Sequence, residues 1–202
     1  MNFDPHQITP QECYQLLTHS VIPRPIAWVS TLSAEGILNL APYSFFTVAS
    51  CNPPVLLVTQ VNPRQRTNKD TLTNLAATGE CVVNIVSTAN AAAMNTSCAD
   101  YPANISEFAA AGIEPVASLK VKPAGVKASH VRFECTLREI IEVSPHPSGG
   151  SMMLLDVVNI FVAKEVMQHK QIDATLLDAL GKLGGDSYST TRDGFRLERP
   201  VL

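Results

Sequence analysis

The sequence predicts a mainly β protein with peripheral helices, built around an antiparallel barrel. Strand-like segments follow one another without a regular helix between each pair, which disfavours a doubly wound parallel sheet. Apolar and polar residues alternate from 131 to 138, the period of a long, half-buried antiparallel strand. A short polar connection at residues 33–36, with glycine last, joins two further strands as a hairpin. Together these observations set the expected fold class.

Each element has its own local signal. Thr9-Pro10-Gln11-Glu12 is a capping-box pattern with proline at the first helical position, so a helix is expected to run through Leu17. Asp70 is expected to cap a second helix that Gly79 ends. Short helices are expected at 89–94 and 106–111. Strands are expected at 26–32, 37–40, 45–49, 55–61, 81–86, 131–138 and 152–166.

Length and charge limit the kinds of partner. A chain of 202 residues suits a single domain, 1–202, with a sizeable core. The formal net charge is −3 and no run of lysines or arginines is present, which argues against nucleic acid binding. Only 16% of residues are charged, against about a quarter in a typical domain, so part of the surface is expected to be covered in an oligomer.

The cysteines and the N-terminus indicate the compartment. The five cysteines are scattered and never form a C-x-x-C pair, which fits reduced thiols in the cytoplasm. The first residues lack the pattern of a signal peptide, and no apolar run approaches the ~20 residues of a membrane span. The histidines show no metal-ligand spacing, so no metal site is expected.

Candidate site residues gather between positions 24 and 71, where hydroxyl side chains recur beside apolar runs and a lysine closes the series. Hydroxyls, backbone N–H groups and a lysine suit a phosphate dianion, and a helix start favours an anion. The phosphate candidates are Ser44, Thr47, Lys69, Asp70 and Thr71. The candidates for the walls and edge of an aromatic ring are Trp28, Val29, Ser30, Thr31, Tyr43, Phe45 and Phe46. The pattern therefore favours a flavin mononucleotide.

A structural explanation competes at several of these positions. Ser30, Thr31 and Thr47 also suit the polar face of a strand. Lys69 with Asp70 also suits a solvated turn at a helix start, and Trp28 suits the core. No nucleophile dyad, catalytic triad or P-loop motif is present, so no catalytic side chain is expected. The glutamates near 131–142 are expected on a solvated face.

The ordered motifs are similar to those of the flavin reductase-like, FMN-binding split-barrel family, in its longer, flavoredoxin-like branch. The resemblance covers about residues 21–188, which are expected to form the core of the domain. The motifs are Arg24-Pro25-Ile26-Ala27, Val29-Ser30-Thr31, Asn39-Leu40-Ala41-Pro42-Tyr43-Ser44-Phe45-Phe46, Asn52-Pro53-Pro54, Lys69-Asp70-Thr71-Leu72-Thr73-Asn74 and Gly181-Lys182-Leu183-Gly184-Gly185.

The resemblance implies a six-stranded antiparallel Greek-key split barrel that forms a homodimer with FMN near the interface. It implies that residues 29–31 and 44–47 contact the isoalloxazine ring and ribityl chain, and that Lys69 and Thr71 hold the phosphate. It also implies reduction of the flavin by NAD(P)H or another donor. The short-form members carry Gly-Asp-His, a signature linked to nicotinamide use, on a late strand, where this chain has Leu155-Asp156-Val157-Val158 and no histidine, so direct NAD(P)H use stays open.

Three functions remain open at this point. The first is an FMN-dependent oxidoreductase that passes electrons to an acceptor such as free flavin. The second is a non-enzymatic electron carrier fed by a partner reductase or ferredoxin. The third is a binding or structural module that kept the barrel and lost the flavin.

Overall fold

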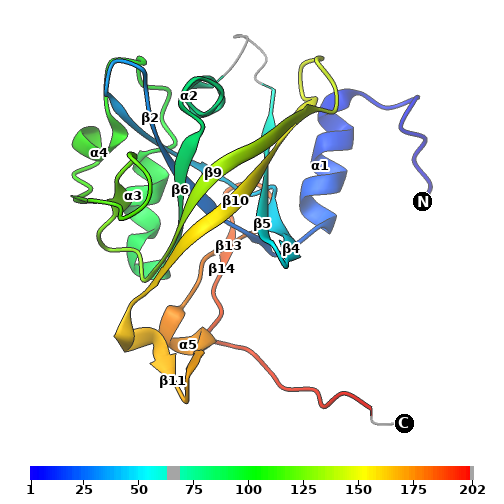
Figure 1. The fold of residues 1–202 in the computed structure, drawn as a ribbon. Coiled ribbons are helices and arrows are strands. Elements are labelled where there is room, and N and C mark those ends of the chain that lie inside the picture. The colour runs from blue at the N-terminus through cyan, green and yellow to red at the C-terminus, as the bar shows by residue number, and fades with distance from the viewer. Residues whose placement is uncertain (63–68, 201–202) are drawn as a thin grey trace.

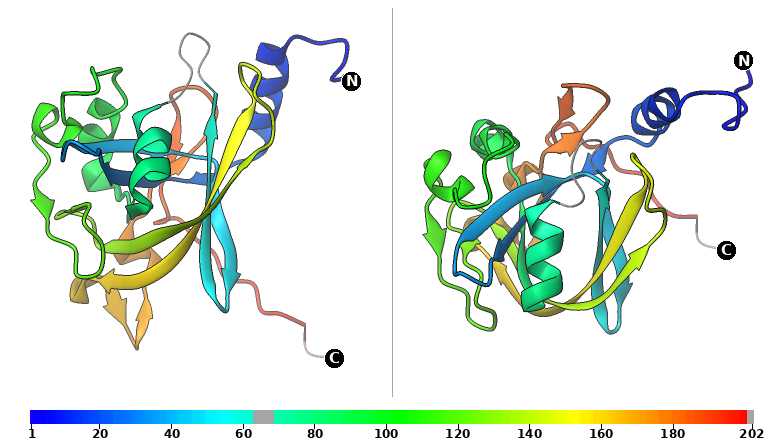
Figure 2. Two further views of the ribbon diagram at one scale, coloured as in Figure 1. Left: turned by 45° about the horizontal axis from the view of Figure 1, so that its top comes forward. Right: turned by 90° about the horizontal axis from the view of Figure 1, so that it is seen from above.

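The computed structural model describes residues 1–62 and 69–200, and its main feature is a seven-stranded antiparallel sheet (Figure 1). Viewed from above, the strands curve into an incomplete ring with a helix across one end (Figure 2). Each strand segment expected from the sequence pattern is present, whereas the resemblance implied six strands. In sheet order the strands are β3 (Leu38–Tyr43), β2 (Ala27–Leu32), β6 (Glu80–Ile85), β9 (Val131–Glu142), β10 (Gly150–Val162), β5 (Pro54–Val61) and β4 (Phe46–Cys51). The mainly β fold class is confirmed.

Short elements surround this sheet. The helices are α1 (Pro10–Ser20), α2 (Asp70–Thr78), α3 (Ala91–Thr96), α4 (Glu107–Ala110) and α5 (Ala174–Leu177), with 3₁₀ turns η1 (Thr88–Asn90) and η2 (Lys164–Val166). A three-stranded sheet joins β1 (Arg24–Pro25), β13 (Gly181–Lys182) and β14 (Tyr188–Ser189). The two-stranded sheets are β7 (Pro115–Val116) with β8 (Gly125–Val126), and β11 (Met167–Gln168) with β12 (Gln171–Ile172). Within the described ranges, no helix is long and apolar enough to cross a membrane.

The capping box predicted at the start of α1 is confirmed. The Thr9 hydroxyl accepts a hydrogen bond from the Glu12 N–H at 3.2 Å, and the Glu12 carboxylate accepts one from the Thr9 N–H at 2.8 Å. Pro10 occupies the first helical position, where its missing N–H costs no hydrogen bond. Thr18 is the buried residue of this helix, which lies on the outside of the sheet (Figure 1).

Three expected boundaries differ from the structure. Strand β3 continues through Pro42 to Tyr43, because it pairs only with β2 and an edge strand tolerates the missing donor. Strand β10 ends at Val162, and the segment expected to continue it turns into η2. Lys69 is the N-cap of α2, without a side-chain capping bond, so Asp70 is the first helical residue and not the cap.

Two apolar cores share strand β2 as their common wall. Ala27 and Val29 face the inner core, whereas Ile26 and Trp28 face the outer one. The remaining buried members of the inner core are Tyr43, Leu56, Val58, Leu72, Leu75, Cys81, Val83, Cys135, Met153 and Leu155. The outer core adds Leu40, Val86, Met94, Phe108, Ile113, Val126 and Leu180, and so joins α3 and α4 to the sheet. Because both faces of β2 are covered, its sequence lacks the alternation of a half-exposed strand.

Gly79 ends α2 in the left-handed conformation, with φ +72°, and its N–H bonds to the Leu75 carbonyl. An L side chain in this conformation costs about 1–2 kcal/mol. We therefore expect Gly79→Ala to lower the free energy of unfolding by about 1 kcal/mol in urea titration. Gly194→Ala is the control, because a Cβ there lies 3.9 Å from its nearest neighbour and φ is not positive. Equal stability of the two variants would contradict the assignment.

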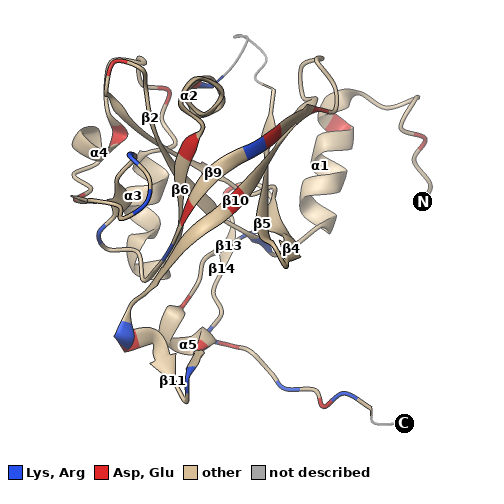
Figure 3. Cartoon of the chain, viewed as in Figure 1, with Lys and Arg blue, Asp and Glu red and all other residues tan. Residues whose placement is uncertain are grey.

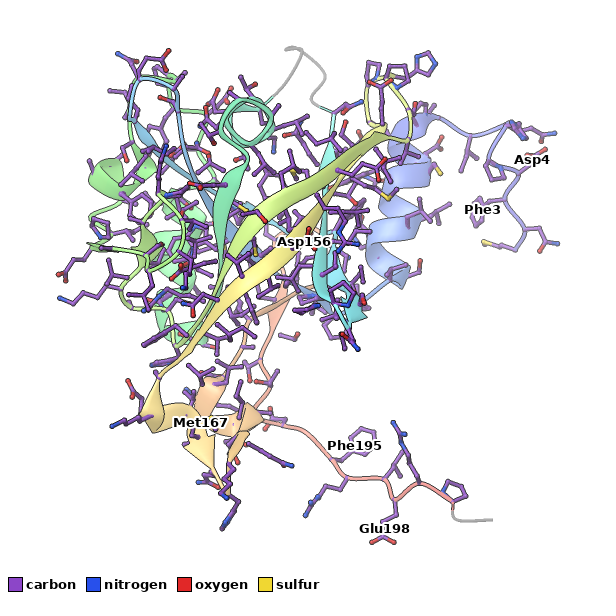
Figure 4. The ribbon with its side chains drawn as sticks, viewed as in Figure 1. Phe3, Asp4, Asp156, Met167, Phe195 and Glu198 are labelled. Atoms are coloured by element: carbon purple, nitrogen blue, oxygen red, sulfur yellow. The ribbon has the colours of Figure 1, made fainter. Side chains whose placement is uncertain are left out.

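The C-terminal segment runs away from the body of the molecule. Thr191 anchors its start, accepting from the Ala179 N–H at 2.9 Å and donating to the Ala174 carbonyl at 2.7 Å. Beyond it, Phe195 and Leu197 are 85% and 83% exposed, and Figure 4 shows Phe195 on an extended chain clear of the sheet. Charges of both signs are interspersed over the ribbon (Figure 3), without the clustered basic face that nucleic acid binding needs.

Candidate functional site

The chain bends at Ser44 and Phe45, where it leaves β3 for β4. The Phe45 carbonyl accepts a hydrogen bond from the Thr59 N–H at 2.7 Å, which fixes the bend against β5. The Lys69 Nζ lies 5.7 Å from the centre of the Tyr43 ring, and the Arg24 guanidinium carbon lies 6.0 Å from that of Phe45. We call this group, Arg24, Tyr43, Ser44, Phe45 and Lys69, the Ser44 corner.

Arg24 fixes the Ser44 corner from its buried side. Its side chain is 7% exposed, and its Nε donates to the Ser44 hydroxyl at 3.3 Å. The guanidinium also donates to backbone carbonyls at the end of α1 and in the segment after β13, namely those of Thr18, Val21 and Leu183. One buried cation therefore ties α1, the corner and the 181–185 segment together.

The start of α2 supplies further donors beside the corner. The first N–H groups of a helix have no intrahelical acceptor, and they favour an anion. Lys69 offers no side-chain capping bond to them, and both Lys69 and Asp70 are half-buried. An ammonium, a hydroxyl and helix N–H groups are the donor types that a phosphate dianion requires, so this set of residues fits the tail of a flavin nucleotide.

A buried polar network fixes α2 on the sheet. The Asn39 amide oxygen accepts from the hydroxyls of Thr71 at 2.9 Å and Thr31 at 3.3 Å. Its amide nitrogen donates to the Glu107 carboxylate at 3.0 Å, and Asn74 donates to Thr31 at 3.2 Å. We call these five residues the Asn39 network. It joins β2, β3, α2 and α4, and so positions the helix start that carries Lys69.

Glu107 makes stability depend on pH. Burial raises the pKa of its carboxyl, although hydrogen bonds from the Leu40 N–H and the Asn39 amide act in the opposite direction. Between the ordinary value and this raised pKa the folded state binds more protons than the unfolded state. Stability therefore falls as pH rises through that window, and the loss is complete above the folded pKa.

We expect wild type to lose stability relative to Glu107→Gln as pH rises from about 4. Urea titrations at a series of pH values measure this difference. Glu35→Gln, in the exposed hairpin turn, is the control. A wild type that gains stability relative to Glu107→Gln over this window would contradict the sign.

The structure places the β2 candidates in the interior. Trp28 is 1% exposed and its indole N–H donates to the Ser97 hydroxyl at 2.9 Å. Val29 packs in the inner core, the Ser30 hydroxyl donates to the Ala124 carbonyl, and Thr31 belongs to the Asn39 network. These side chains have protein partners and almost no exposed surface. Their contact with a flavin ring stays a prediction.

The remaining candidates divide between the corner and its surroundings. Tyr43, Ser44, Phe45 and Lys69 belong to the corner, and Asp70 follows Lys69 as the first residue of α2. Phe46 packs against the inner core, Thr47 is exposed further along β4, and the Thr71 hydroxyl is used by Asn39. Of Thr71, only the backbone at the helix start remains a candidate phosphate donor.

Sequence reasoning missed two polar anchors. Arg24 belonged to the first motif but was not nominated; its position between two prolines in an apolar stretch was the available signal. Glu134 was expected on a solvated face, yet it is buried and accepts from the N–H groups of Leu119 at 3.0 Å and Lys120 at 2.6 Å. Burial alone would raise the pKa of Glu134, but these bonds outweigh it and the net pKa is lowered.

Comparison with known proteins gives concordant matches. The model of the flavin reductase like domain matches residues 18–182. The structure of nitrilotriacetate monooxygenase component B from Bacillus cereus is 34% identical, with a TM-score of 0.92 over 98% of both chains. That of the 2-nitrobenzoate 2-nitroreductase NbaA from Pseudomonas fluorescens is 30% identical, with a TM-score of 0.89 over 100% of this chain and 97% of the other. A split-barrel protein from Shewanella frigidimarina is 22% identical, with a TM-score of 0.82 over 100% and 99% of the chains, and shows the same fold.

Proposed function

The chain belongs to the flavin reductase-like family, and on this premise we propose that it is an FMN-dependent oxidoreductase. Electrons would pass from a nicotinamide or another donor through bound FMN to a second acceptor such as free flavin. The observation that carries the proposal is the Ser44 corner, where a lysine at a helix start lies beside aromatic and hydroxyl side chains.

The protein's part would be binding and orientation. The flavin supplies the redox chemistry when bound, so no separate acid or base is required. Lys69 and the N–H groups at the start of α2 would bind its phosphate. Phe45 would flank the nucleotide, while Ser44, held by Arg24, would donate or accept a hydrogen bond at a fixed position. The Tyr43 ring, buried in the inner core, would support the Lys69 ammonium.

Two assays test the proposal. Purified protein titrated with FMN should show saturable binding, and addition of NADH or NADPH should give oxidation at 340 nm above the buffer rate. Because one relative is named a 2-nitrobenzoate 2-nitroreductase, 2-nitrobenzoate is assayed beside free FMN as the acceptor. Oxidation that never exceeds the buffer rate would rule out the nicotinamide-dependent reductase.

An electron carrier is the second candidate, and Asp156 favours it. Leu155-Asp156-Val157-Val158 stands where short-form members carry Gly-Asp-His and contains no histidine, and the Asp156 carboxylate is paired with Arg138 at 2.6 Å. FMN that is bound and photoreduced, yet unresponsive to both nicotinamides, would support the carrier fed by a partner protein. A preparation that binds no FMN would favour the third function, a barrel without a flavin.

We also propose that the working unit is a homodimer with FMN near the interface. The apolar side chains left exposed on α1 and the C-terminal segment, among them Leu17 and Phe195, are surface that a second copy would cover. Light scattering on an eluting gel-filtration peak tests this, and a mass of one chain, 21.8 kDa, would refute it. A cytoplasmic location stays a prediction, with which five free thiols agree.

A further inference from the structure

The motif at residues 181–185 has no role in the proposal so far, yet it lies beside the Ser44 corner. Strand β13 pairs with β1 on one side and with β14 on the other. In this register Lys182 lies directly opposite Arg24 and directly opposite Tyr188. Residues opposite each other on antiparallel strands project to the same face, so these three side chains form one row.

This row places two like charges opposite each other, an arrangement that destabilises a sheet. Among residues 1–62 and 69–200, Arg24 donates to neutral oxygens, those of Ser44 and three backbone carbonyls. Within the same residues, no carboxylate forms an ion pair with Arg24 or Lys182. Because buried or half-buried charges are normally compensated, an anionic ligand beside this row would be stabilised.

Two contacts hold the row at the corner. The Arg24 guanidinium donates both to Ser44 and to the Leu183 carbonyl at 3.0 Å, next to Lys182. The Lys182 Nζ lies 4.0 Å from the centre of the Tyr188 ring, which fixes the half-buried ammonium without neutralising it. The 181–185 segment is therefore a second cationic wall, facing the same bend in the chain as Lys69 does.

Both lysines act electrostatically on the Cys98 thiol. Burial raises its pKa, and the Lys69 and Lys182 ammonium groups both act to lower it. Each charge therefore lies within electrostatic range of this sulfur. The segment also lies close to the end of α1: a Cβ on Gly184 would lie 2.0 Å from the ring of His19, which would have to move.

We propose that Lys182 binds a phosphate group of a ligand at the Ser44 corner, with Arg24 behind it contributing to the positive potential. The inference rests on the proposed function, in which Lys69 takes one phosphate. The phosphate at Lys182 comes either from FMN itself or from the diphosphate of a dinucleotide electron donor. Lys182 is then a binding residue, whereas Arg24 positions the wall.

The test compares K182Q, K182R and K127Q in the full chain. Lys127 is a matched surface lysine paired with Glu114. Dissociation constants are measured for FMN and for riboflavin, which lacks the phosphate, and KM values for NADH and NADPH. We expect K182Q to weaken one phosphate-bearing ligand about tenfold or more, K182R to retain most of the binding, and K127Q to change nothing.

The pattern of weakened ligands shows which of them supplies the phosphate. Loss of FMN binding with riboflavin unchanged assigns the phosphate to FMN, whereas a raised KM with FMN unchanged assigns it to the dinucleotide. Ligand-free K182Q should not melt below wild type, because it removes a like-charge pair, whereas a purely structural lysine would lower the Tm. K182Q that matches K127Q with every ligand overturns the inference.

A separate measurement distinguishes failure of the proposed function from failure of this inference. Wild type that binds no flavin would remove the oxidoreductase but not the anion site. In that case thermal stabilisation by inorganic pyrophosphate, present in wild type and K127Q and lost in K182Q, supports the inference. Equal stabilisation of K182Q and K127Q overturns it.

Discussion

Replacing Asn39 with alanine is expected to lower the free energy of unfolding by about 3–4 kcal/mol. The side chain serves Glu107, Thr71 and Thr31 at once, and all three are buried. A hydrogen bond to a charged group contributes about 1.5–3 kcal/mol to stability, and a bond between neutral groups contributes about 1 kcal/mol. The buried groups that bonded to Asn39 would also be left without a partner, because water cannot reach them. Urea titration monitored by tryptophan fluorescence measures the loss.

The matched control is Asn62→Ala. Asn62, just after β5, also donates twice, to the carbonyls of Ser144 at 2.8 Å and His146 at 3.2 Å, but these lie in the β9–β10 connection near the surface. Its loss should cost about 1 kcal/mol, because water replaces the lost partner. If both variants lose the same stability, the Asn39 network does not fix α2 as described.

Replacing Lys69 with methionine is expected to weaken FMN binding about 10- to 100-fold. The ammonium lies beside the Tyr43 ring at the start of α2, where a phosphate would meet both the charge and the helix N–H groups. Methionine is a flexible, unbranched side chain one atom shorter than lysine, and it removes the charge together with its N–H donors. Fluorescence titration with FMN and with riboflavin measures the effect.

Titration with riboflavin distinguishes loss of the Lys69 charge from a change in the shape of the binding site. Its affinity should change little in Lys69→Met, because it carries no phosphate, and Lys127→Met should bind both ligands as wild type does. Equal loss of both ligands in Lys69→Met would mean that the substitution distorts the corner. Unchanged FMN affinity would remove Lys69 from the proposed site.

The sequence was sufficient wherever the determining contacts are local. The capping box at Thr9 and Glu12 and the stop at Gly79 follow from neighbouring residues and appear where expected. Each expected strand of the main sheet is present, although the ends of β3 and β10 differ. The resemblance to the flavin reductase-like family is confirmed. It specified a split barrel, whereas the alternation of apolar and polar residues predicts only an antiparallel barrel.

The site was harder to predict because its contacts are long-range. Ser30 and Glu134 look like surface residues in sequence, and only the layer formed by residues 117–124 buries them. The hydroxyl of Thr71 seemed free for a phosphate because its acceptor, Asn39, lies 32 positions away. Arg24 and Lys182 become neighbours only when β1 pairs with β13.

Strand β2 is paired on both edges and covered on both faces, since residues 27–30 bond to β3 and β6 while the two cores enclose them. Solvent can therefore reach these amides only when the whole domain opens. In deuterium exchange, the N–H groups of Val29 and its neighbours should be among the slowest, with protection equal to the global unfolding equilibrium. The barrel and its outer helices would then come apart in one cooperative event.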